Sequence, residues 1–133
     1  MLHALLTDYE YSGYNVRGFD LGNHFCEWMA NYATSTPHVV DVNLFPTKEE
    51  RLAFMRAYLG QCATTESAEA LDNEAMHYAL ASHLMWALWG VIESTISEID
   101  FDYAAYAQQR IEAFHHFEGV MGVTIPRVAL RET

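Results

Sequence analysis

The sequence predicts a mainly α-helical domain with one short strand near its N-terminus. Apolar residues recur every three to four positions in several windows, which is typical of amphipathic helices. The chain has 133 residues, enough for one domain of ordinary size. Its 51% hydrophobic and 19% charged content indicates a folded chain rather than a disordered one.

The N-terminal half is expected to form the strand and two helices. The apolar run at residues 2–6 predicts the strand, and turn-forming residues follow it. Helical spacing of apolar side chains predicts a helix from about Asp20 to Ala33, which a Ser-Thr-Pro cluster ends. Further on, Thr47-Lys48-Glu49-Glu50 has the pattern of a capping box, so a helix is expected to begin there and to end near Gly60.

The C-terminal half is expected to form two longer helices. The first runs from about Glu66 to Ser97, and its core stripe is expected to be Met76, Leu80, His83 or Leu84, Ala87 and Val91. Asp100 or Asp102 can cap the second, which is expected to end at about Glu118 before Gly119. Residues 1–122 are therefore assigned to the domain and residues 123–133 to a loose tail.

The charge balance argues against some partners. Eighteen Asp and Glu against seven Lys and Arg give a formal charge of −11. Nucleic acid is not an expected partner because phosphate binding needs a basic face. A cationic or metal-bound ligand suits the negative charge of this chain better. The two cysteines predict no disulfide framework, and no apolar run is long enough for a transmembrane segment. The expected localisation is cytoplasmic.

Acidic side chains near the N-terminus are candidates for a site. Asp8 and Glu10 follow the predicted strand, a common position for a magnesium ligand, although acids there also suit the start of a loop. Glu27 lies seven residues after Asp20, on about the same face of the predicted helix. An acid on so apolar a helix needs a partner. Two alternatives remain open: a carboxylate that faces a site, or a surface pair of Arg17 with Asp20.

Aromatic side chains gather at the expected junction of the last two helices. Two tryptophans three residues apart share a helical face, which Glu93 extends, and three more rings open the next helix. These rings are Trp86, Trp89, Phe101, Tyr103 and Tyr106. Several ring faces beside acids can form a cage for a quaternary ammonium group by cation–π attraction. Rings at helical spacing are also typical of a hydrophobic core, so both interpretations stay open on spacing alone.

Four segments closely resemble the choline/ethanolamine kinase family. They are the run from Asp8-Tyr9-Glu10 to Trp28, Phe45-Pro46-Thr47-Lys48, the tryptophan segment Ala79–Trp89, and Ile99–Gln108 with its start Ile99-Asp100-Phe101-Asp102-Tyr103. The resemblance covers most of residues 5–122. It implies the C-terminal helical part of a protein-kinase-like α+β fold. It also implies ATP-dependent phosphorylation of choline to phosphocholine, a step of phosphatidylcholine synthesis.

The resemblance implies a role for each candidate residue. Asp8 is expected to bind Mg²⁺, with Glu10 as its companion in the D-x-E motif, and Glu27 is expected to be a second essential carboxylate near the magnesium and the alcohol. These three acids form the expected catalytic set, and Asp8 and Glu27 the expected metal ligands. The aromatic wall around the trimethylammonium group is expected to comprise Tyr11, Tyr32, Trp86, Trp89, Phe101, Tyr103 and Tyr106.

Part of the kinase machinery has no counterpart in this sequence. The phosphate-covering loop, the phosphate-binding lysine and the catalytic loop of such kinases are missing, and Lys48 is the only lysine. We therefore expect the isolated chain to be inactive, with ATP as a partner only if a nucleotide lobe is supplied. Choline is the favoured substrate. The alternatives are an ethanolamine kinase and a non-catalytic remnant that binds cations.

Overall fold

The computed structural model describes residues 10–122, and it confirms a mainly α-helical fold. The elements in chain order are α1 (Arg17–Glu27), the short 3-10 helix η1 (Val42–Leu44), α2 (Lys48–Leu59), a second 3-10 turn η2 (Gly60–Cys62), α3 (Thr65–Ile96) and α4 (Tyr103–Met121). The strand expected at residues 2–6 and the tail expected at 123–133 lie outside the described residues.

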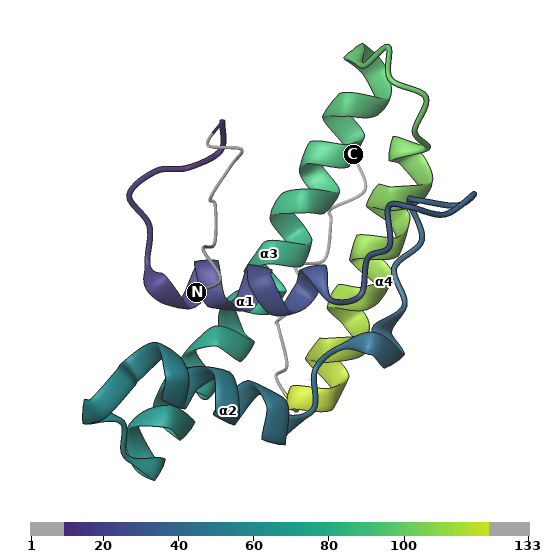
Figure 1. The fold of residues 1–133 in the computed structure, drawn as a ribbon. Coiled ribbons are helices and arrows are strands. Elements are labelled where there is room, and N and C mark those ends of the chain that lie inside the picture. Colours follow the sequence, from purple (N-terminus) through teal and green to yellow (C-terminus); the bar gives the residue numbers. More distant parts are fainter. Residues whose placement is uncertain (1–9, 123–133) are drawn as a thin grey trace, which may run out of the picture.

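The helices pack around α3, which is the longest of them. α3 and α4 run antiparallel side by side, α1 crosses α3, and α2 lies at the N-terminal end of α3 (Figure 1). The segment between α1 and α2 returns along α4, where the backbone N–H of Val40 donates a hydrogen bond of 2.6 Å to Gln109 Oε1. This arrangement brings the C-terminal end of α1 against the middle of the α3–α4 pair.

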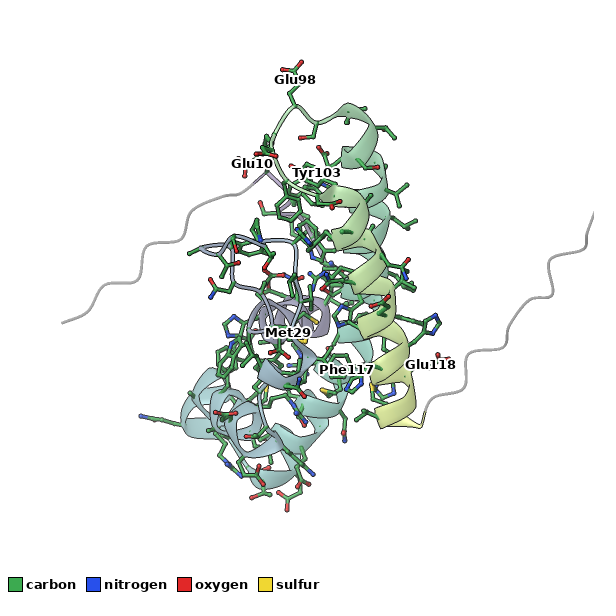
Figure 2. All side chains as sticks on the ribbon, turned by 90° about the vertical axis from the view of Figure 1, so that its right-hand side faces the viewer. Glu10, Met29, Glu98, Tyr103, Phe117 and Glu118 are labelled. Carbon is green, nitrogen blue, oxygen red and sulfur yellow. The ribbon has the colours of Figure 1, made fainter. Side chains whose placement is uncertain are left out.

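Two apolar clusters form the core. One joins α1, α2 and α3 through Leu21, Phe25, Met55 and Leu71. The other joins α1 and its following turn to α3 and α4 through Cys26, Met29, Leu80, Phe114 and Phe117. In Figure 2, Met29 and Phe117 lie in the body of the bundle, whereas Tyr103 lies nearer the hairpin end of α3 and α4. That hairpin end is thus left for a site outside the main core.

The helix caps predicted from the sequence are largely confirmed. The capping box at α2 has both of its bonds: Thr47 Oγ1 accepts from the Glu50 N–H at 3.3 Å, and Glu50 Oε2 accepts from the Thr47 N–H at 2.8 Å. Gly60 ends α2 with a φ of 67°. Of the two acids proposed to cap the last helix, Asp102 does so, because its Oδ1 accepts from the Ala105 N–H at 2.9 Å.

Two predicted helix ends are wrong. α1 stops at Glu27 rather than Ala33, because the Met29 carbonyl accepts a hydrogen bond of 2.9 Å from the Asp41 N–H and Ala30 forms an antiparallel bridge with Val40. α4 continues past Gly119 and ends at Gly122, which has a left-handed φ of 64°. A glycine inside a helix costs only about 1 kcal/mol and therefore need not end it.

The predicted core stripe of α3 is partly wrong. Leu80, His83 and Ala87 are buried, but the alternative Leu84 is 40% exposed and Val91 is 56% exposed. The stripe therefore passes through His83 and not through Leu84. Between residues 10 and 122, no helix combines the length and the apolar character needed to cross a membrane.

His83 is a fully buried polar residue beside the second apolar cluster. Its ring stacks on Phe117 with centroids 5.5 Å apart, and its Nε2 lies 3.5 Å from Cys26 Sγ. Its Nδ1 has no hydrogen-bond partner in the described part of the chain. Burial, with a smaller contribution from the Arg110 charge, lowers the pKa of His83 to about 3. The imidazole is therefore neutral in the folded protein at neutral pH.

We expect His83 to make the stability fall as the pH is lowered. Because its pKa in the folded state lies below its ordinary value of 6.5, the unfolded chain takes up the proton first. The stabilisation that neutral His83 gives the folded state is complete above pH 6.5. As the pH falls from 6.5 towards 3, the free energy of unfolding decreases by at most about 1.4 kcal/mol per pH unit. Urea unfolding between these two pH values should show a shallower pH slope for His83→Met. Equal slopes for the wild type and for His83→Met would contradict this account.

Candidate functional site

A cavity of about 240 Å³ opens at the hairpin end of α3 and α4. A cavity of this volume can hold a small molecule. Figure 2 shows Tyr103 at this end of the bundle. The cavity is lined by Glu27, Tyr32, Trp86, Trp89, Ile99, Phe101, Tyr103 and Tyr106.

The structure brings together the five rings singled out at the two helix ends. Trp89 is central: its ring centroid lies 5.3 Å from that of Trp86, 5.4 Å from Tyr103 and 6.1 Å from Tyr106. Phe101 completes the group at 4.8 Å from Tyr103. Most of these pairs meet edge to face, the arrangement that aromatic quadrupoles favour. The rings therefore line a cavity, and two of them, Tyr103 and Tyr106, are at the same time buried.

Close helix packing and polar anchors orient the two tryptophans. A Cβ at Gly90 would lie 3.1 Å from the Tyr103 carbonyl oxygen, so the glycine lets α3 and α4 approach closely at this position. Trp86 Nε1 donates to Asn23 Oδ1 at 2.7 Å, and the Ser82 hydroxyl donates to the same oxygen at 2.7 Å. Asn23 was not among the residues proposed from the sequence, because its partners lie on a different helix.

Tyr11 lies on the outer side of the cavity. Trp89 Nε1 donates to the Tyr11 hydroxyl at 2.9 Å, and the Tyr11 ring lies 5.8 Å from that of Trp86. Tyr11 is 69% exposed and so borders the rings rather than lining the cavity. Glu10 is exposed, and Asp8 lies outside the described residues.

Glu27 lines the cavity from the last residue of α1. One of its oxygens accepts from Arg110 Nη2 at 3.0 Å, and the other accepts from the Tyr32 hydroxyl at 2.9 Å. The alternative of an Arg17–Asp20 surface pair is wrong, because Arg17 Nη2 lies 3.2 Å from Glu74 Oε2 instead. Glu27 lines the cavity, and its role in a functional site stays a prediction.

Arg110 is a component of the site that sequence reasoning missed. It lies one helical turn after Tyr106 on α4, and its side chain is only 1% exposed. Its guanidinium carbon lies 5.3 Å from the centroid of the Tyr106 ring. The sequence does contain a signal for it, because Arg110 lies on the helical stripe of Tyr103, Tyr106 and Phe117. A charge on a buried stripe requires a partner.

Around Glu27, the two tyrosine hydroxyls stay protonated and the arginine stays charged at neutral pH. Loss of solvent, followed by the Glu27 charge, raises the pKa of Tyr32 well above its usual range, and burial raises that of Tyr106. Burial alone would lower the pKa of Arg110, but Tyr106 and Glu27 raise it more, so the guanidinium stays charged. Tyr32 is therefore a hydroxyl donor, and Arg110 a permanent cation.

The described residues do not by themselves make a magnesium site. Within residues 10–122, no group of three His, Cys, Asp or Glu side chains lies close enough to hold a metal ion. The charge of Glu27 is already balanced by Arg110, which weakens its attraction for a second cation. The expected magnesium site of Asp8 and Glu27 stays a prediction.

Comparisons with known proteins agree on one family. Residues 3–115 match the family model described as Choline/ethanolamine kinase. Probable choline kinase 1 of Arabidopsis thaliana is 45% identical over 112 residues, which cover 82% of this chain and 32% of the relative. Choline kinase alpha of Mus musculus is 37% identical over 131 residues, which cover 90% of this chain and 29% of the relative. The Choline/ethanolamine kinase of Homo sapiens is 39% identical over 126 residues, which cover 86% of this chain and 32% of the relative. The chain spans about a third of the length of these relatives.

Proposed function

Because the chain belongs to the choline/ethanolamine kinase family, we propose that it forms the part of a choline kinase that holds the alcohol substrate. In the whole protein, the terminal phosphoryl group of ATP passes to the choline hydroxyl and gives phosphocholine. The family resemblance predicted from the sequence is confirmed by the family match. The activity and substrate of the whole protein are proposals that rest on this membership.

The aromatic cavity is the observation that carries the proposal. A trimethylammonium group has no N–H donor and is attracted to ring faces, each of which contributes about 0.5–2 kcal/mol. Trp86, Trp89, Tyr103 and Tyr106 border one small cavity from two adjacent helices. We assign these rings, with Phe101 and Tyr32, to the trimethylammonium group, and Tyr11 to the rim.

The lining of the cavity favours choline over ethanolamine. A primary ammonium group brings three N–H donors that require acceptors when they are buried. In the described lining, Glu27 is the one charged acceptor, and both of its oxygens already accept hydrogen bonds. Choline therefore fits better than the alternative substrate. A non-catalytic role in binding cations would use the same cavity.

The catalytic roles of the acids are proposed from the family. Asp8 and Glu27 are proposed to bind the magnesium that accompanies ATP, which would supply positive charge beside the phosphates, and Glu10 is proposed as the companion of Asp8 in the D-x-E motif. Glu27 is proposed to lie near both the metal and the alcohol, and its position in the cavity wall supports the contact with the alcohol.

A ligand titration of the chain tests the proposal. Tryptophan fluorescence reports on the cavity once Trp28 is replaced by Phe, because Trp28 lies against His24 and does not line the cavity. We expect saturable changes with choline and with tetramethylammonium, and at least about fivefold weaker binding of ethanolamine. The absence of any change with choline, or equal binding of ethanolamine, would contradict the proposal.

A further inference from the structure

Arg110 is the largest fully buried side chain of the described residues, and it lies behind two residues of the cavity lining, Glu27 and Tyr106. It is 1% exposed, whereas the Glu27 side chain is 36% exposed and lines the cavity. Its Nε has no hydrogen-bond partner among residues 10–122. Burying a guanidinium is costly without a counter-ion, so the carboxylate of Glu27 is what makes this buried cation tolerable.

The pairing also sets the charge that a ligand meets. The other residues that line the cavity are aromatic or apolar, so Glu27 is the single charged group of the described lining. Arg110 lies behind it and brings the sum of the two charges to zero. Arg110 and Tyr32 each hold one carboxylate oxygen, from α4 and from the segment after α1, so the carboxylate is also fixed in place.

We propose that Arg110 is a positioning residue that determines substrate specificity: by balancing the charge of Glu27, it makes the cavity select a quaternary ammonium over a primary one. This inference rests on the proposed function and adds the reason for its selectivity. With Glu27 balanced, a cation is held by ring faces, which serve a trimethylammonium group well. With Glu27 unbalanced, both ligands are attracted to its charge, but only a primary ammonium can also donate hydrogen bonds to the carboxylate.

The test measures the ratio of the ethanolamine and choline dissociation constants in Arg110→Met. We expect this ratio to fall about tenfold relative to wild type, because ethanolamine binds the freed carboxylate. Arg51→Met is the matched control: Arg51 also forms a largely buried ion pair, with Nε 2.7 Å from Asp72 Oδ1, but it does not line the cavity. Its ratio should stay at the wild-type value. Arg110→Lys retains the positive charge and should keep most of the selectivity.

A double variant covers the case in which Arg110→Met does not fold. Arg110→Met with Glu27→Gln removes both buried charges, and such neutral replacements are often tolerated. Because a balanced pair adds no net charge, we expect the double variant to keep the wild-type ratio within about twofold. A tenfold fall of that ratio overturns the inference, as does an unchanged ratio in Arg110→Met. Both results leave the proposed function standing, whereas a wild-type chain that binds neither ammonium overturns the proposed function itself.

Discussion

Gly22→Ala is expected to lower the free energy of unfolding by about 3 kcal/mol, the upper part of the range for overpacked sites. A Cβ at residue 22 would lie 2.5 Å from the Ala75 carbonyl oxygen and 2.7 Å from the Ala79 backbone nitrogen. Both atoms belong to the backbone of α3, so no side-chain rotation relieves the clash. α1 must move away from α3, and it carries Asn23 and Glu27 with it.

Gly119→Ala is the control for this experiment. Gly119 also lies inside a helix, but a Cβ there meets nothing within 4 Å. Alanine is the better helix former, so this variant should gain about 0.5–1 kcal/mol. Urea unfolding of both variants gives the comparison. Equal effects of the same sign at the two positions would contradict the close crossing of α1 and α3.

Trp89→Ala is expected to raise the dissociation constant of choline about tenfold or more. Trp89 contacts the rings of Trp86, Tyr103 and Tyr106, so its removal opens the centre of the aromatic wall. A loss of about 1.4 kcal/mol, within the range for one ring face, corresponds to tenfold in affinity. The titration described above measures the change through Trp86.

Two controls separate a binding role of Trp89 from a structural one. Trp28→Ala removes an indole outside the cavity lining and should leave choline binding unchanged. The free energy of unfolding of Trp89→Ala should remain close to that of Trp28→Ala, since neither indole is fully buried. A collapse of stability in Trp89→Ala alone, with binding lost in proportion to the unfolded fraction, would assign Trp89 to the core.

The sequence predicts features that depend on near neighbours. The start of α2 follows from Thr47 and Glu50, three residues apart, and the clustering of Trp86 with Trp89 follows from helical spacing. The end of α1 depends instead on the contact of Met29 with Asp41, across a loop that carries no periodic pattern. Local pattern therefore predicts that helices exist better than it predicts where they end.

The polar contacts of the site could not be predicted from the sequence, because they too join residues that lie far apart in the chain. Glu27 and Arg110 are 83 residues apart, and Asn23 and Trp86 are 63 apart. Periodicity places each residue on a face of its own helix, but it does not state which faces meet. The aromatic wall could be proposed because its members lie at the adjoining ends of two consecutive helices. The ion pair behind it required the tertiary structure.

The most direct test of the central claim compares choline with its neutral isostere, in which carbon replaces the quaternary nitrogen. The two molecules share their shape and hydroxyl group and differ in charge. If ring faces hold the ammonium group by cation–π attraction, choline should bind to the chain at least about tenfold more tightly than the isostere. Equal dissociation constants for the two ligands would show that the cavity recognises only apolar shape, and would contradict the account.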